Sequence, residues 1–171
     1  KIIMKASKII ITSTAVLLAL SLSACGTTSN KSTSTNHSSS AKKHAEFHKV
    51  GDTVKAGQIT YTLNSVEVTD ERNEFADDNP QHVIKVTYHV KNNSNQALPI
   101  GTDLAVYGPD NTKLKSYPIN GTTLDSVAAG KEADVVTGFG IDKLGEVELH
   151  FAPLVSTQQP AKFKVNVTNP N

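Results

Sequence analysis

Five acidic residues crowd one short stretch between two alternating apolar segments. They are Asp70, Glu71, Glu74, Asp77 and Asp78. Ca²⁺ takes about six to eight oxygen ligands, several of them often carboxylates, and such a stretch could supply some of them. The spacing matches no EF-hand loop, so the competing interpretation is a solvated acidic loop. The sequence therefore leaves a calcium site as one hypothesis for these residues.

Histidines suggest a second metal hypothesis. His44 and His48 lie four residues apart with Glu46 between them, and His37 lies upstream. On a short helix His44 and His48 would share a face and could bind Zn²⁺. The alternative is that they belong to a solvated segment and have no specific role.

The only cysteine, Cys25, follows a lysine-bearing N-terminus and an apolar stretch over 9–20. This layout is typical of a secretory signal and is short for a transmembrane span. The run Leu22-Ser23-Ala24-Cys25 resembles a bacterial lipobox, whose cysteine thiolate accepts a diacylglyceryl group before the peptidase cuts in front of it. The resemblance implies a mature protein held by acyl chains on the outer face of the cell membrane. An ordinary secretory signal, cut elsewhere, is the alternative.

Catalytic patterns are absent from the sequence. It contains no G-x-S-x-G elbow, no P-loop and no H-E-x-x-H pair. Glu146 and Glu148 share one face of an expected strand, but their apolar neighbours favour the solvent side of an amphipathic strand over a catalytic pair. Blue copper is excluded, because Cys25 would be acylated and the only methionine, Met4, lies in the signal. We therefore expect a protein that is not an enzyme and whose only cofactor-like group is the lipid on Cys25.

The net charge and the composition exclude some classes of binding partner. Removing residues 1–24 takes away three of the 17 basic residues and leaves 14 against 16 acidic ones, a formal charge of −2. A nearly neutral chain has no basic surface for nucleic acid. No disulfide can form within one mature chain, so the fold must depend on its core.

Composition divides the chain into three parts. Residues 1–24 form the expected lipoprotein signal peptide, and 25–46 form a lipidated cysteine with a Ser/Thr/Lys/His-rich tether. The tether has almost no apolar side chains, so we expect it to be disordered. Residues 47–169 regain periodic apolar residues and are long enough for one folded domain.

Period-two alternation dominates that domain and predicts strands. It includes the runs around 59–68, 82–90, 104–106, 133–141, 147–151 and 163–167. A phase slip at Asn64-Ser65 predicts a β-bulge, and Gly108-Pro109-Asp110-Asn111 predicts a turn. No segment has a helical apolar stripe. The expected fold is all-β: an antiparallel, immunoglobulin-like β-sandwich of about seven to nine strands.

Several of these segments together resemble a known family. They are Val50-Gly51-Asp52-Thr53-Val54, the strand over 83–92 with its closing asparagine, the run 127–131 and the strand over 147–151. The stretch from about 48 to 152 is similar to the telokinin-like, immunoglobulin-like domain of Gram-positive lipoproteins, which is related to a secreted immunoprotective antigen. The resemblance implies a sandwich at the cell surface and gives no catalytic residue to transfer.

The function that these features favour is a membrane-anchored, extracytoplasmic binding or interaction module. Its partner would be a protein or a cell-wall ligand, and not a nucleic acid. Two alternatives remain open at this point: an accessory subunit of an envelope complex, and a surface protein that binds calcium or a small ligand.

Overall fold

The structure, a computed structural model, describes residues 46–170. This part of the chain forms nine strands and no helix, so none of it could cross a membrane as an apolar helix. The strands are β1 (Thr53–Ala56), β2 (Ile59–Thr69), β3 (His82–Asn92), β4 (Leu98–Ile100), β5 (Leu104–Tyr107), β6 (Asp125–Val127), β7 (Glu132–Ile141), β8 (Gly145–Phe151) and β9 (Ala161–Val167). The signal peptide, the lipobox and all of the expected tether except Glu46 lie outside the described residues.

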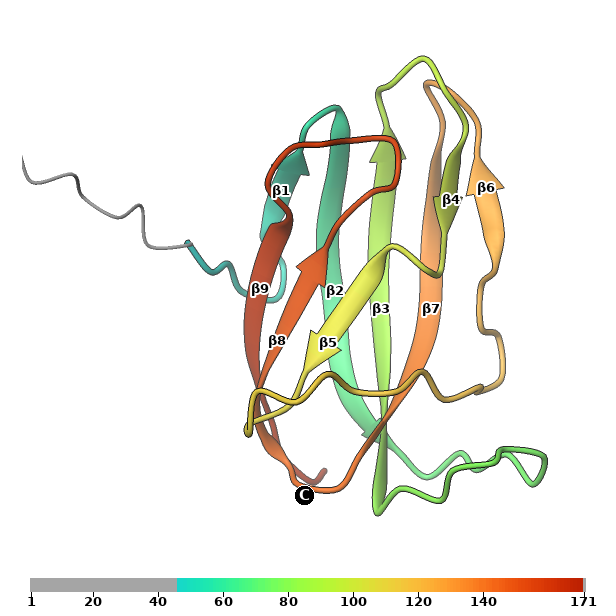
Figure 1. Cartoon of the computed structure of the whole chain (residues 1–171), viewed down its shortest axis with the longest axis vertical. Helices are drawn as coiled ribbons and strands as arrows, with labels where there is room; N and C mark the ends of the chain where they lie inside the picture. Colours follow the sequence, from blue (N-terminus) through green and yellow to red (C-terminus); the bar gives the residue numbers. More distant parts are fainter. Residues whose placement is uncertain (1–45, 171) are drawn as a thin grey trace, which may run out of the picture. The chain divides into compact units, whose positions relative to one another are not determined.

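The strands pair in antiparallel order throughout. One sheet has the order β1-β2-β3-β7, a second has the order β5-β8-β9, and β4 pairs with β6. Figure 1 shows β5, β8 and β9 lying across β1, β2 and β3, and one apolar core joins the strands of both sheets. The prediction of an antiparallel β-sandwich is therefore confirmed.

The alternation of apolar and polar residues in β2 explains which face of the sheet β1-β2-β3-β7 packs against the core. Ile59, Tyr61 and Leu63 are fully buried, and the register against β3 shifts between Leu63 and Ser65. After the shift Val66 and Val68 still pack against the core. This is the β-bulge that the phase slip predicted, and it keeps the apolar residues of a long strand on one face.

The outer face of β3 is polar along most of its length but apolar at one end. There Val83 is buried in a small second cluster with Tyr117 and Ile119. The segment 115–123 that carries these side chains also bonds along β7, with Tyr117 N donating to Gly138 O and Thr123 N to Val136 O. The segment thus covers the outer edge of β7, a role that its sequence did not indicate.

One carboxylate lies inside the core. Asp103 is 3% exposed and accepts hydrogen bonds from the hydroxyls of Tyr61, at 2.8 Å, and Tyr88, at 2.7 Å. Its Oδ1 also accepts from Gly101 N at 3.1 Å. Burial, together with the nearby carboxylate, raises the pKa of both tyrosines above the ordinary value of 10.0. The rings of the two tyrosines pack against Phe151.

Candidate binding site at one end of the sandwich

Three connections meet at one end of the sandwich: the loops 70–81, 108–124 and 142–144. The first of these contains all five acidic residues of the calcium hypothesis. Arg72 closes its base, because the guanidinium donates to Thr69 O at 2.9 Å and to Gln81 O at 3.4 Å. These two carbonyls stand at opposite ends of the loop, so the only arginine of the chain joins its two stems.

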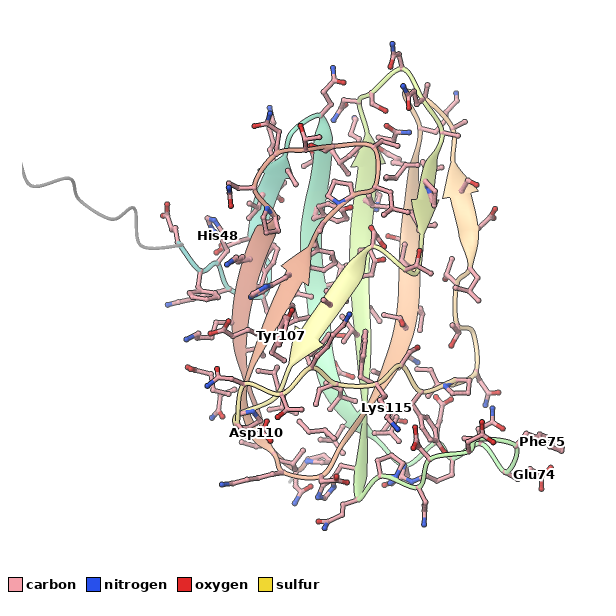
Figure 2. The ribbon with its side chains drawn as sticks, viewed as in Figure 1. His48, Glu74, Phe75, Tyr107, Asp110 and Lys115 are labelled. Atoms are coloured by element: carbon pink, nitrogen blue, oxygen red, sulfur yellow. The ribbon has the colours of Figure 1, made fainter. Side chains whose placement is uncertain are left out.

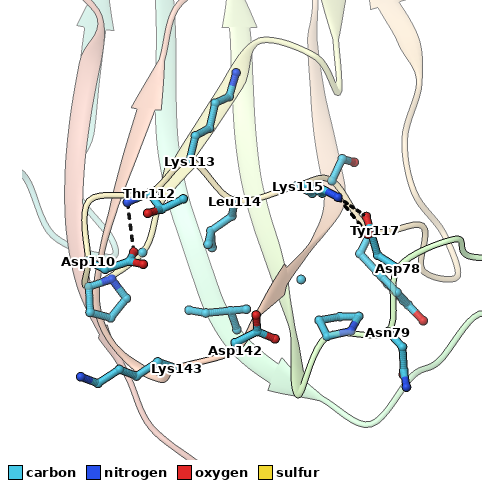
Figure 3. A pocket seen from close by; sticks show the side chains of 16 residues that line it. Asp78, Asn79, Asp110, Thr112, Lys113, Leu114, Lys115, Tyr117, Asp142 and Lys143 are labelled. Atoms are coloured by element: carbon cyan, nitrogen blue, oxygen red, sulfur yellow. Dashed lines mark hydrogen bonds and ion pairs between the residues drawn. The ribbon is translucent and has the colours of Figure 1, made fainter.

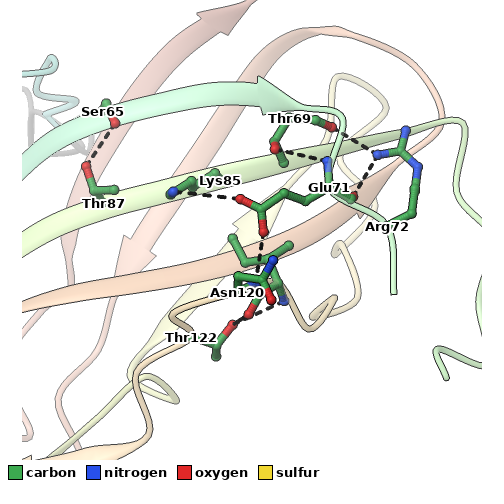
Figure 4. A network of polar contacts seen from close by, with 9 residues as sticks. Ser65, Thr69, Glu71, Arg72, Lys85, Thr87, Asn120 and Thr122 are labelled. Carbon is green, nitrogen blue, oxygen red and sulfur yellow. Dashed lines mark hydrogen bonds and ion pairs between the residues drawn. The ribbon is translucent and has the colours of Figure 1, made fainter. Parts of the chain in front are cut away.

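Glu71 fixes the loop to the sheet and to its neighbour. One carboxylate oxygen lies 3.9 Å from Lys85 Nζ on β3, and the other accepts from Asn120 N at 2.9 Å (Figure 4). Farther along, Asp78 forms an ion pair with Lys115 at 2.9 Å. Loop 70–81 is therefore held at its base, at its side and near its second stem.

The acidic residues do not converge on one point. Glu71 and Asp78 each face a lysine, whereas Asp70, Glu74 and Asp77 are exposed and make no ion pair within residues 46–170. No group of three or more His, Cys, Asp or Glu side chains in that part of the chain is placed to hold a metal ion. The five acidic residues that are crowded in the sequence are thus spread over the loop, two of them paired with lysines and three exposed.

Phe75 occupies the tip of this loop and is 85% exposed. Two hydrogen bonds hold the backbone at the tip. Phe75 N donates to Asn73 Oδ1 at 2.9 Å, and Asn73 N donates to the Tyr117 hydroxyl at 2.9 Å. Figure 2 shows Phe75 and Glu74 pointing away from the sandwich. A large aromatic side chain is thus held in solvent by a loop that is itself fixed.

A groove of about 360 Å³ lies beside the loop, between residues 78–80, the segment 108–117 and residues 140–143 (Figure 3). Its apolar lining comes chiefly from Pro80, Pro109, Leu114 and Ile141. The turn predicted at 108–111 forms one wall, with Gly108 N donating to Thr112 O at 2.9 Å and Asn111 in a left-handed conformation at φ 62°.

Three aspartates at the groove each accept a hydrogen bond or form an ion pair within the structure. Asp110 accepts from Thr112 N at 3.0 Å, Asp142 accepts from Gln81 N at 3.1 Å, and Asp78 pairs with Lys115. Hydrogen bonds from Thr112, with a smaller contribution from nearby Lys143, hold the pKa of Asp110 below its ordinary value.

The three lysines at the groove differ in whether they form an ion pair. Lys113 and Lys143 line it and form no ion pair within residues 46–170, whereas Lys115 is paired. Figure 3 shows that the two ammonium groups point in different directions, that of Lys113 above the groove and that of Lys143 away from it at the lower left. The lining thus carries three lysines and three aspartates beside its apolar side chains, and the formal charges balance.

The other residues singled out in the sequence lie elsewhere. His48 is half-buried beside β9, where its backbone bonds to Lys162 O and Lys164 N at 2.9 Å, so it belongs to the folded domain. Glu146 and Glu148 share one outward face of β8 and both approach Lys164, at 3.1 and 3.3 Å. His37, His44 and the lipobox residues Leu22, Ser23, Ala24 and Cys25 lie outside the described residues.

No pattern in the sequence pointed to the groove. Its walls come from three connections that are far apart in the chain, and Lys113 and Lys143 belong to no recognisable motif. Only the turn at 108–111 could be predicted, and a turn by itself does not identify a binding site.

Comparisons with known proteins establish the fold. No protein-family model and none of the curated proteins compared match the chain. Among solved structures, YcdA of Bacillus subtilis, described as a candidate lipoprotein, is 20% identical with a TM-score of 0.58, over 67% of this chain and 38% of that one. YjhA of Bacillus subtilis is 17% identical, with a TM-score of 0.54, over 71% and 100%. The secreted protein MPT63 of Mycobacterium tuberculosis is 8% identical, with a TM-score of 0.53, over 72% and 99%. The chain thus shares its β-sandwich fold with bacterial proteins and spans well under half the length of YcdA.

Proposed function

We propose that this protein is a bacterial lipoprotein, anchored through Cys25 to the outer face of the membrane of a Gram-positive cell. Its sandwich domain would serve as a non-enzymatic interaction module. The lipobox resemblance at residues 22–25 supports the anchor. The descriptions of YcdA as a candidate lipoprotein and of MPT63 as a secreted protein agree with an extracytoplasmic location.

The observation that carries the interaction role is the groove of about 360 Å³ itself, with its apolar lining and its charged side chains of both signs. A concave apolar site with a few convergent polar groups is the usual form of a ligand site. Because the flanking loop is fixed by Arg72, Glu71 and Asp78, the site is largely formed before a ligand arrives, and little ordering entropy remains to be lost.

The chemistry of the groove selects a class of ligand. Pro109, Leu114 and Ile141 favour an apolar side chain. Lys113 and Lys143, which make no ion pair within residues 46–170, lie at two sides of the groove, where carboxylates that flank this side chain could pair with them. A peptide segment with an aromatic or aliphatic residue next to acidic residues has this chemistry. We therefore infer a protein partner that presents such a segment.

A non-enzymatic role agrees with how the acidic groups at this end are used. Each aspartate of the groove accepts a backbone hydrogen bond or pairs with a lysine. Within residues 46–170 no side-chain nitrogen or oxygen that is fully buried lacks a hydrogen-bond partner. The three aspartates of the groove therefore have local structural partners, which supports a structural role for them.

Peptide titration monitored by NMR tests the proposal on the full chain with Cys25→Ser. The probes are blocked peptides with Phe, Leu or Ile between two acidic residues, and the controls replace the acids by Gln or Asn. We expect shifts at Leu114 and Ile141 with the acidic peptides only, and their loss in Lys113→Glu/Lys143→Glu. A matched Lys55→Glu variant, changed on exposed β1, should bind normally. If no acidic peptide shifts the groove resonances, the proposed function is wrong.

A further inference from the structure

We propose that Asn120 is a site of spontaneous deamidation, and that its conversion to a carboxylate detaches the segment 115–123 from the loop 70–81. The inference does not depend on the ligand proposed for the groove. Its starting point is the pair Asn120-Gly121, the only place in the chain where a glycine follows an asparagine.

The reaction joins the Asn120 side chain to the next main-chain nitrogen. The Gly121 nitrogen attacks the carboxamide carbon, Cγ, of Asn120, and a five-membered succinimide ring forms. The bond from Cγ to the side-chain nitrogen breaks, and ammonia leaves with the proton that the Gly121 nitrogen gives up. Water then adds to either carbonyl of the ring and yields aspartate or isoaspartate. Glycine favours the step, because it has no side chain to hinder the approach and its backbone adopts many conformations.

The turn that carries this pair leaves the reacting peptide group without a hydrogen bond. Asn120 and Gly121 are exposed and lie between Ile119 and Thr122, where Thr122 N and Thr122 Oγ1 donate to Ile119 O at 3.3 and 2.8 Å. Within residues 46–170 neither Gly121 N nor Asn120 O makes a hydrogen bond, and the carboxamide of Asn120 makes none either.

Ring closure requires this peptide group to rotate until the Gly121 nitrogen faces Cγ. Gly121 has φ 75°, the left-handed value that the third residue of a type II turn requires. Rotation about ψ of Asn120 and φ of Gly121 breaks no hydrogen bond of the peptide group. It also meets open space, since a Cβ on Gly121 would have no atom within 4 Å. The two residues can therefore reach the reactive geometry while the turn stays closed at Ile119 and Thr122.

Two other asparagines lack these conditions and serve as internal references. The Asn92 side chain is buried and donates to Gln96 O and Val127 O at 2.7 and 2.9 Å. Asn111 is exposed, but the nitrogen that would attack belongs to the β-branched Thr112 and donates to Asp110 at 3.0 Å. The reaction should therefore prefer Asn120 to both.

Asn120 lies where the segment 115–123 meets the loop 70–81. Its backbone N donates to one carboxylate oxygen of Glu71 at 2.9 Å, and the other oxygen lies 3.9 Å from Lys85 Nζ (Figure 4). A carboxylate at position 120 places a second negative charge beside Glu71, and like charges at short range repel. In isoaspartate the main chain also gains one carbon atom, which displaces the turn. Both products therefore weaken the contact with Glu71.

Peptide mapping by mass spectrometry tests the modification on the folded full chain with Cys25→Ser. The protein is aged at neutral pH in heavy-oxygen water, so that only conversion during the incubation carries the label. We expect labelled aspartate and isoaspartate at position 120, formed at least about tenfold faster than at Asn92 or Asn111, a barrier lower by about 1.4 kcal/mol. Asn120→Gln should abolish both products, because its longer side chain cannot close a five-membered ring.

The same chain unfolded in urea shows whether the turn permits the reaction. We expect the folded rate at Asn120 to lie within about tenfold of the unfolded rate, a barrier difference below about 1.4 kcal/mol. A folded rate far below that range, conversion no faster than at the two reference asparagines, or aspartate as the only product would each overturn the proposed site.

Hydrogen exchange on the separated, converted protein tests the detachment. The Thr123 amide, which donates to Val136 O at 2.9 Å, should exchange faster than in the unconverted protein. The Gly108 amide, which donates to Thr112 O outside the segment 115–123, should keep its protection. Unchanged exchange at Thr123, or an equal loss of protection at Gly108, would show that the modification does not detach the segment.

Discussion

Asp103 is a single buried residue whose hydrogen bonds link several strands of the core. Its carboxylate accepts from two tyrosine hydroxyls and from Gly101 N. Its own carbonyl accepts from Ala152 N, just after β8. A buried charge of this kind is tolerated only when such hydrogen bonds replace its hydration. The network therefore ties β2 and β3 of one sheet to the β4–β5 connection and to the end of β8.

Replacing Asp103 by alanine should destabilise the domain strongly. The change leaves the hydroxyls of Tyr61 and Tyr88 buried without an acceptor, and each unsatisfied group costs about 1–3 kcal/mol. We expect the free energy of unfolding to fall by about 2–4 kcal/mol in a urea titration. Asp77→Ala removes an exposed carboxylate with no ion pair and should change it by less than about 0.5 kcal/mol. Similar losses in the two variants would show that the network contributes nothing.

The same network predicts loss of stability at alkaline pH. Burial, and then the Asp103 carboxylate, raise the pKa of Tyr61 and Tyr88 above 10.0, so the folded state keeps two protons that the unfolded state releases. Stability is therefore intact below about pH 10 and falls above it, by about 1.4 kcal/mol per pH unit for each tyrosine. Urea unfolding between about pH 8 and 11 checks this. Tyr61→Phe should remove about half of the added slope, and a slope unchanged by that substitution would contradict the assignment.

At the scale of elements, the segment 115–123 acts as a cover for the edge of β7. The cover depends on glycine: a Cβ on Gly138 would lie 2.4 Å from the Tyr117 carbonyl oxygen. Gly138→Ala should therefore push the segment away and expose the Tyr117 and Gly140 amides to hydrogen exchange. Gly130→Ala meets no atom within 4 Å and strains only its own left-handed turn, so those amides should remain protected. Equal protection in both variants would mean that the cover is not held by this contact.

The loop 70–81 gives a prediction about calcium. Because no three of its carboxylates lie close enough together to hold one ion, we expect millimolar CaCl₂ to change the Tm no more than NaCl of equal ionic strength, through screening alone. A true site would add stability by mass action and raise the Tm by several degrees at a large excess over Kd. A thermal scan with CaCl₂, MgCl₂ and NaCl separates the two. A rise specific to calcium would restore the metal hypothesis.

The strands also show how much of the fold could be predicted from the sequence. Long strands such as β2, β3 and β7 were predictable, because burial on one face imposes strict alternation, and even the bulge near Asn64 left a visible phase slip. The three-residue strands β4 and β6 are too short to show a period. Asp103 and the groove were not predictable, since burial of a carboxylate and the meeting of three loops are decided only by tertiary packing.

For the whole molecule, the proposed lipid anchor on Cys25 would decide where the protein is located. Cys25→Ala removes the only thiol that can accept lipid and should block cleavage before that residue. We expect the variant to remain as an unprocessed precursor or to appear in the medium, and to leave the detergent phase in a partitioning experiment. Cys25→Ser should behave in the same way, because serine lacks the thiol. Wild-type partitioning of both variants would contradict the lipoprotein proposal.

The bridge at His48 also has a mechanical consequence. Any pull that arrives along the chain from its N-terminal side first meets two backbone hydrogen bonds, His48 N to Lys162 O and Lys164 N to His48 O. The next contacts in line are Gly51 N to Leu63 O and the four-residue strand β1, which is an edge of its sheet. The groove is formed by other segments, in the connections around 78–80, 108–117 and 140–143. Under tension we expect β1 to detach first from the edge of its sheet, while β2, β3 and β7 and the sheet β5-β8-β9 stay paired and a partner bound in the groove is kept.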